Sequence, residues 1–179
     1  ILAVPGFFLI SFLRGEIKCM QGIHRNSIVL AVAVGLLCYY LGSLVNFYAL
    51  TILDAGLERV LLFTYPTLVV IIGSMTGLTK ATTPILICIL VTFLGILLVV
   101  GGGAEEMLYE NINGAGWVGL CALTIAIYLL TADKLIPTMG SGMFTLIAMS
   151  AAAFGSVIHI AFRMNISDLI MSQEIWILL

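Results

Sequence analysis

Charged side chains are what this sequence has least of. Only 9% of its 179 residues are charged, whereas 62% are hydrophobic, and a soluble domain carries about 25% charged residues. Seven basic and nine acidic side chains cannot give a chain of this length a solvated surface, because even a small domain keeps much of its surface in contact with water. The composition therefore excludes a soluble globular domain and indicates a protein whose solvent is lipid.

Basic clusters and catalytic signatures are missing as well. The Lys and Arg residues are scattered singly, so no basic stripe can neutralise phosphates, and nucleic acid is excluded as a partner. The sequence has no HExxH, no GxSxG, no Walker loop and no paired intramembrane aspartates. It has no CxxC motif or Cys/His cluster either, and three of its cysteines fall in apolar stretches, where they are interpreted as packing residues. We therefore expect no catalytic residues, no metal and no cofactor.

Five long uncharged stretches predict transmembrane helices, since a spanning helix needs about 20 apolar residues. Continuous apolar runs such as 85–100 lack the alternation of a transmembrane strand and can satisfy their backbone groups in lipid only as helices. The predicted fold class is therefore an all-α polytopic membrane protein. The five predicted spans are residues 26–53, 60–79, 81–104, 111–132 and 135–162.

Both ends of the sequence are apolar but too short to cross a bilayer. Residues 1–13 lack a preceding basic region and a small-residue cleavage site, so they are not interpreted as a signal peptide. They resemble the last half of a helix, and residues 175–179 break off within an apolar run. We therefore expect five complete transmembrane helices plus two partial ones.

The orientation follows from the basic residues, because short basic loops stay on the cytoplasmic side. Predicted loops alternate between basic and acidic without exception, which places 14–25, 80 and 134 inside and 54–59, 105–110 and 163–174 outside. Five basic residues lie on the inside against two outside. The inside residues are Arg14, Lys18, Arg25, Lys80 and Lys134.

The most specific pattern runs from Tyr48 to Gly102. It reads YALTILDAGLERVLLFTYPTLVVIIGSMTG, then a short basic turn, then ILVTFLGILLVVGG. A Tyr-Ala-Leu step, a small or acidic turn and a Tyr-Pro pair in the next helix resemble an EamA-type transporter of the drug/metabolite transporter superfamily. Trp117 and the Ala-Ile-Tyr step ending at Tyr128 resemble the start of that family's second half.

The resemblance implies ten helices arranged as two five-helix repeats. Residues 1–104 would then be the C-terminal part of the first repeat, from late helix two to helix five. Residues 105–179 would be the N-terminal part of the second repeat, from helix six to early helix eight. One departure is that many members carry a Gly-Glu-Arg-like signature after helix four, where this chain has Gly77, Leu78, Thr79 and Lys80.

Polar side chains inside apolar stretches mark a cavity or a helix contact. Gly35, Tyr39, Gly42 or Ser43, and Asn46 recur at steps of three or four residues, which places them on one helix face. Tyr39 and Asn46 are candidates for lining a substrate cavity, and packing by the glycines with a backbone contact by Asn46 is an equally weighted alternative.

The next span contains a second group of candidates. Pro66 removes a backbone donor and leaves polar backbone groups in the membrane, as transporters do at binding sites, although a structural role is favoured for it. Tyr65 can stack on and hydrogen-bond an organic solute, and Tyr128 is expected to point inward from a later span. Gly73 and Gly77 form a face typical of helix contact.

Glu58 and Arg59 stand at the predicted outer start of this span. They are interpreted either as interfacial capping residues or as an outer gate that contacts a charged substrate. Because the carboxylates all fall at predicted interfaces, the sequence assigns no residue to proton coupling.

Together these patterns predict a secondary transporter that moves a small organic metabolite or drug-like solute by alternating access. Sparse intramembrane charge favours neutral, zwitterionic or aromatic solutes, and the resemblance favours export across a bacterial cytoplasmic (inner) membrane. The expected partners are the substrate and the lipid bilayer, with a homodimer left open. The alternatives are a non-transporting membrane scaffold, whose inward face would pack dry, and, third, an intramembrane enzyme.

Overall fold

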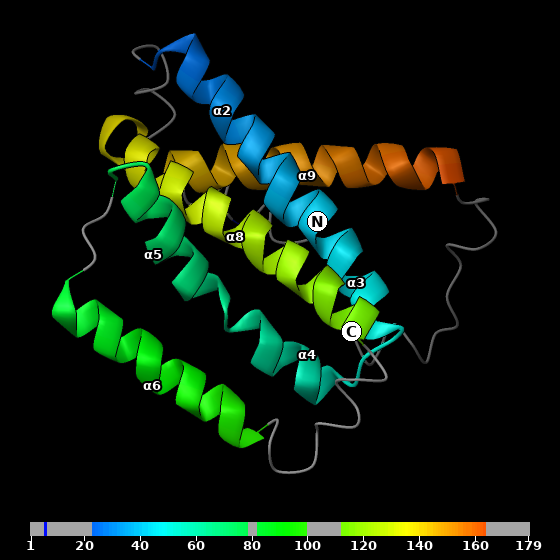
Figure 1. Cartoon of the computed structure of the whole chain (residues 1–179). Coiled ribbons are helices and arrows are strands. Elements are labelled where there is room, and N and C mark those ends of the chain that lie inside the picture. Colours follow the sequence, from blue (N-terminus) through cyan, green and yellow to red (C-terminus); the bar gives the residue numbers. More distant parts are fainter. Residues whose placement is uncertain (1–5, 7–22, 79–81, 100–111, 164–179) are drawn as a thin grey trace.

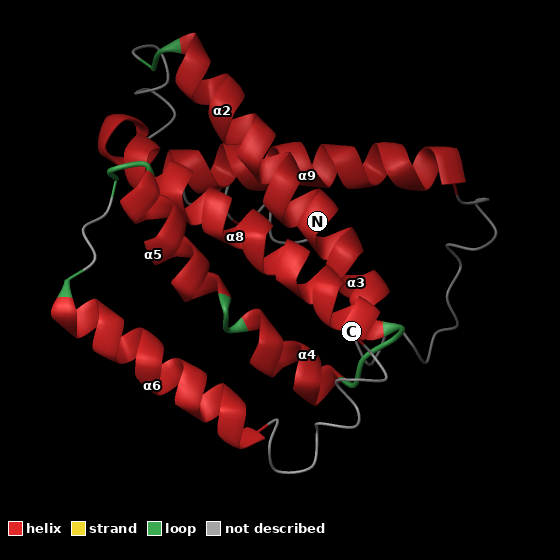
Figure 2. Ribbon diagram, viewed as in Figure 1, coloured by secondary structure: helices red, strands yellow, loops and turns green. Residues whose placement is uncertain are grey.

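The computed structural model describes residues 23–78, 82–99 and 112–163 together with Gly6 (Figure 1). Every regular element in these ranges is a helix (Figure 2). Four helical stretches are long and apolar enough to cross a membrane, namely Arg25–Leu50, Ala55–Met75, Ile112–Met139 and Ser141–Phe162. The all-helical fold class is thus confirmed, with four helices able to span a membrane, while the two predicted partial helices at the ends lie outside the described residues.

The first span is one continuous rod built from three segments. It comprises α2 (Arg25–Gly35), the π-helical segment η2 (Leu36–Gly42) and α3 (Ser43–Leu50). A π-helix closes i→i+5 hydrogen bonds and so takes more residues per turn than an α-helix. The stretch from Gly35 to Asn46 therefore does not keep the 3.6-residue period on which its predicted face was based.

The second span is interrupted in the middle. It comprises α4 (Ala55–Leu62) and α5 (Tyr65–Met75), separated by a turn at Phe63 and Thr64. Asp54 caps α4, because its side chain accepts a hydrogen bond from the Gly56 N–H at 2.8 Å. The predicted start at residue 60 is wrong, since the helix begins at Ala55 and includes Glu58 and Arg59.

The predicted third span, 81–104, corresponds to α6 (Thr83–Val99), which lies at the edge of the molecule (Figure 1). Its 17 residues extend about 25 Å at 1.5 Å per residue, whereas the hydrocarbon core is about 30 Å thick. Residues 100–111, which follow it, lie outside the described part. A count of five complete spans therefore stays a prediction.

The last two spans meet at a tighter turn than the sequence predicts. Helix α8 (Ile112–Met139) is followed by α9 (Ser141–Arg163), and Gly140 joins them with a φ of 81° that favours glycine. The predicted break at residues 133–134 is wrong, because α8 continues through Asp133 and Lys134, whose side chains are exposed.

Helix α8 is the centre of the packing. It contacts α2, η2, α3, α4, α5 and α9, and it has the largest number of buried residues of any described helix. A second close contact joins the first span to α9, where a Cβ atom on Gly35 would lie 2.5 Å from the Cα of Ala148. Gly73 is buried as its predicted contact role requires, but Gly77 adopts a φ of 70° just beyond the end of α5 and ends that helix instead.

Candidate functional site

An open pocket of about 410 Å³ lies between the first span, the second span and α8. The first span contributes Cys38, Tyr39, Gly42, Ser43, Asn46 and Phe47; the second contributes Leu62 and Tyr65; and α8 contributes Cys121, Ile125, Tyr128 and Leu129. Four of the five predicted substrate-binding residues therefore surround one space. They are Tyr39, Asn46, Tyr65 and Tyr128. Their role in binding a substrate stays a prediction.

The pocket lies at the middle of the spans that form it. Tyr39 is the fifteenth of the 26 residues in its span, Tyr65 the eleventh of 21 and Tyr128 the seventeenth of 28. Two local irregularities also fall here. The π-helical segment supplies Cys38, Tyr39 and Gly42, and the break between α4 and α5 directly precedes Tyr65. Both π-helical turns and broken membrane helices are frequent at functional sites.

Aromatic side chains form one wall. The hydroxyl of Tyr39 donates to that of Tyr128 at 3.2 Å, and their rings meet edge to face with centroids 5.1 Å apart. The centroid of the Phe144 ring, on α9, lies 5.3 Å from that of the Tyr128 ring. This arrangement fixes Tyr128 from two directions and offers a solute both ring faces and hydroxyl groups.

Polar atoms around the pocket are few. The Ser43 hydroxyl donates to the Tyr39 carbonyl at 2.8 Å, and the Thr124 hydroxyl, beside Gly42, donates to the Cys121 carbonyl at 2.7 Å. In contrast, the buried Oδ1 atom of Asn46 has no hydrogen-bond partner among the described residues. Oδ1 therefore makes no backbone hydrogen bond there, and the choice between cavity lining and helix packing for Asn46 stays a prediction.

Pro66 lies apart from the other candidates. It is the second residue of α5, where a missing N–H costs no helical hydrogen bond, and it lines a smaller pocket of about 230 Å³ between α5 and α6. The backbone irregularity that the sequence assigns to Pro66 lies just before it, where the Thr64 hydroxyl donates to the Leu61 carbonyl at 2.8 Å. Pro66 thus starts a helix and is not among the residues that line the larger pocket.

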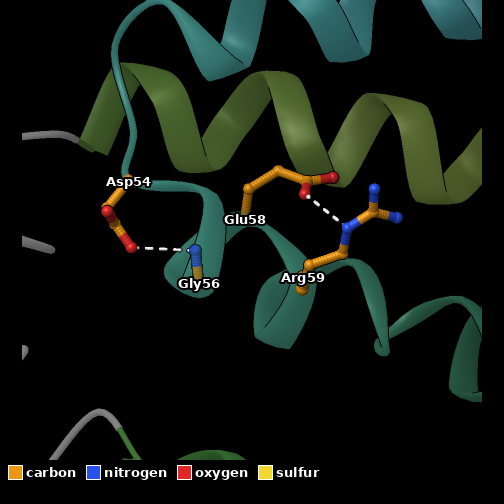
Figure 3. Close-up of polar contacts among 4 residues, drawn as sticks. All are labelled: Asp54, Gly56, Glu58 and Arg59. Carbon is orange, nitrogen blue, oxygen red and sulfur yellow. Dashed lines mark hydrogen bonds and ion pairs between the residues drawn. The ribbon is translucent and has the colours of Figure 1, made fainter. Parts of the chain in front are cut away.

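Glu58 and Arg59 follow one another in α4 but have different surroundings (Figure 3). The side chain of Glu58 is 0% exposed and that of Arg59 is 70% exposed, and Arg59 Nε lies 3.4 Å from Glu58 Oε2. Neither carboxylate oxygen has a hydrogen-bond partner in the ranges that the structure describes. Asp54 caps the helix and Glu58 lies in its first turn; the enclosure of the Glu58 side chain is a feature that its position at a predicted interface does not indicate. The role of the pair as a gate stays a prediction.

Sequence reasoning missed three features of the site. Cys38 and Cys121 line the pocket rather than only packing between helices, and the enclosure of Glu58 depends on α8, which is distant in sequence. The π-helical turn carries no proline or other local signal. Within the described residues, no three His, Cys, Asp or Glu side chains are grouped as a metal site requires.

Comparison with known proteins finds one relevant similarity. The chain is 28% identical over 159 residues to the Bacillus subtilis (strain 168) protein named uncharacterized transporter YcbK, and the aligned region covers 89% of this chain and 51% of that protein. The chain thus spans about half the length of the curated relative it matches. No family model and no solved structure matches it. The apolar helices and the similarity to YcbK fit an integral membrane protein of the transporter class.

Proposed function

We propose that this chain is part of a secondary transporter that carries small organic solutes across a membrane by alternating access. The observation that carries the proposal is the pocket at the middle of the helical spans, which is lined by Tyr39, Asn46, Tyr65 and Tyr128. Its volume of about 410 Å³ lies within the range of about 300 to 1,000 Å³ that is common for small-molecule sites. A scaffold that served only helix assembly would have no need to keep such a space open.

The position of the pocket supports the same proposal. Its walls come from helices on both sides of the predicted repeat boundary at residues 104 and 105, and substrate sites of repeat-built transporters lie at the repeat interface near the midplane. The name of the Bacillus relative is that of a transporter. We therefore assign the chain to an EamA-like transporter with the two-repeat architecture, located in a cytoplasmic membrane and acting in export.

Transport can be tested in cells that lack their own exporters and produce the protein at its full natural length. We expect lower accumulation of an aromatic amine, an aromatic amino acid or a neutral aromatic solute than in cells with the empty vector. Tyr65→Ala should abolish the difference because it removes a pocket wall. Met75→Ala, at an 82% exposed position outside the pocket, should preserve it. Equal accumulation with and without the protein, for all three solute classes, would contradict the proposal.

A further inference from the structure

The buried polar atoms that lack a hydrogen-bond partner point to the charge of the solute. In the described parts of the chain these atoms are the two carboxylate oxygens of Glu58 and Oδ1 of Asn46. All three are hydrogen-bond acceptors. A buried acceptor without a partner costs free energy, and a buried carboxylate costs more unless a positive charge lies beside it. The site is therefore complementary to a donor that carries positive charge.

Glu58 is placed to act on the pocket. Its side chain extends from α4 toward α8 (Figure 3), the helix that provides Cys121, Ile125, Tyr128 and Leu129 to the pocket lining. One helical turn after Glu58, on the same face of α4, Leu62 also lines the pocket. Glu58 itself is not among the lining residues; its carboxylate is enclosed between α4 and α8, one turn from a residue that does line the pocket.

The single partner of this carboxylate is held loosely. Arg59 approaches only Oε2, through one nitrogen at 3.4 Å, and most of its side chain is exposed. An ammonium group could replace it without leaving the buried carboxylate uncompensated, because the largely exposed guanidinium group can turn to water instead. In the described ranges no Lys, Arg or His side chain lines the pocket itself, so a solute cation would meet no like charge there.

The aromatic walls favour the same class of solute. A cation is attracted to the faces of aromatic rings, and the pocket presents the rings of Tyr39, Phe47, Tyr65 and Tyr128. We propose that the pocket takes an organic cation, an amine with an apolar or aromatic body, whose ammonium group is neutralised by the enclosed carboxylate of Glu58. This inference rests on the proposed function. It replaces the broad expectation of a neutral, zwitterionic or aromatic solute with one class, an organic cation.

Binding to the purified protein in detergent micelles tests this with three probes of similar shape. These are 2-phenylethylammonium, the neutral 3-phenylpropan-1-ol and the anionic 3-phenylpropanoate, each titrated by calorimetry. We expect the cation to bind about ten-fold more tightly than the neutral probe and the anion to bind most weakly. This comparison needs no variant, so it stays decisive even if a substitution impairs folding.

Variants then identify the group responsible. Glu58→Gln keeps the shape and removes the charge, so it should abolish the preference for the cation. Arg59→Gln should strengthen cation binding because it releases the carboxylate. Asp54→Asn is the matched control: it removes an exposed carboxylate four residues away and keeps a capping residue, so the preference should persist.

The failures of the two proposals are distinguishable. If the neutral or anionic probe binds as tightly as the cation, or if Glu58→Gln keeps the preference, the cation assignment is wrong while the pocket remains a solute site. If none of the three probes binds, the pocket is not a solute site and the proposed function falls with the inference.

Discussion

Gly35 and Gly119 look alike in sequence, since each lies within an apolar helix, but their surroundings differ. A Cβ atom at Gly35 would lie 2.5 Å from both Cα and the carbonyl oxygen of Ala148, which are backbone atoms that cannot move aside cheaply. A Cβ atom at Gly119 would meet nothing within 4 Å among the described residues. Gly35 is therefore required by the contact between the first span and α9, whereas Gly119 is not required by packing.

This contrast predicts opposite effects of the same substitution. Gly35→Ala should lower the free energy of unfolding by about 1 to 3 kcal/mol, because the added methyl group forces α2 and α9 apart. Gly119→Ala should leave it unchanged or raise it by up to about 1 kcal/mol, because alanine favours the helix. Unfolding of both variants in micelles of increasing SDS fraction measures the difference. Equal stability of the two variants would show that the contact at Ala148 is not close-packed.

Some site residues could be predicted from sequence because a polar group inside an apolar helix is costly unless it has a use. That argument selects Tyr39, Asn46 and Tyr128, and the structure places all three around one pocket. It fails for Glu58, which lies near the end of a span, where sequence cannot distinguish exposure from enclosure. Only the packing of α4 against α8 decides this, and that contact joins segments more than 50 residues apart.

Helix boundaries show the same division between local and tertiary information. Spans delimited by charged residues alone have misplaced starts and ends near Glu58, Asp133 and Lys134. Long charged side chains can stay within a helix and reach water at its end, so charge marks the membrane boundary less well than it marks loops. The true ends are set by Asp54 as a cap and by Gly140 with its positive φ.

The π-helical segment η2 is the element that shapes the pocket. It sits in the middle of the first span and provides Cys38, Tyr39 and Gly42 to the lining. A π-helical turn corresponds to additional backbone within an otherwise α-helical rod. Removing one residue from it should therefore restore an α-helix while α2 and α3 keep their faces.

Two single-residue deletions test this property of the first span. Deleting Leu41, which is in η2 and 47% exposed, should keep the thermal midpoint close to that of the parent while weakening binding of the phenyl probes. Deleting Leu30, which is in α2 and 41% exposed, should lower the midpoint far more, because it rotates one part of the rod against the other by about 100°. Circular dichroism on heating provides the measurement. If both deletions lowered the thermal midpoint equally, η2 would not contain a residue that the first span can lose without rotating α2 against α3.

Within the described residues, helix α8 contacts every helix of the first two spans as well as α9. Residues on both sides of the predicted repeat boundary at 104 and 105 therefore build one pocket, which a transporter could open by moving one repeat against the other. This mechanism requires that the spans alternate in direction. Of the predicted spans, α6 is the one whose crossing most needs a test, because its 17 residues fall short of the usual spanning length.

Whether α6 crosses the membrane determines where the later turns lie. If it crosses, residues 82 and 141 are separated by two crossings, α6 and α8, and lie on the same side; if it does not, they lie on opposite sides. A short helix can still cross, since local thinning of the bilayer costs only fractions of a kcal/mol per Å of mismatch. We expect α6 to cross, with residues 82 and 141 inside and residue 54 outside.

Single cysteines at these three exposed positions can be labelled in a background from which the four native cysteines are removed. A membrane-impermeant maleimide applied to intact cells should modify Asp54→Cys, whereas Thr82→Cys and Ser141→Cys should react only after the membrane is opened. Labelling in denaturing detergent confirms that each thiol is reactive. Labelling of Ser141→Cys but not Thr82→Cys in intact cells would mean that α6 stays on one side. The predicted two-repeat architecture would then be wrong, because the alternation of the later spans would be inverted relative to the basic residues that predict it.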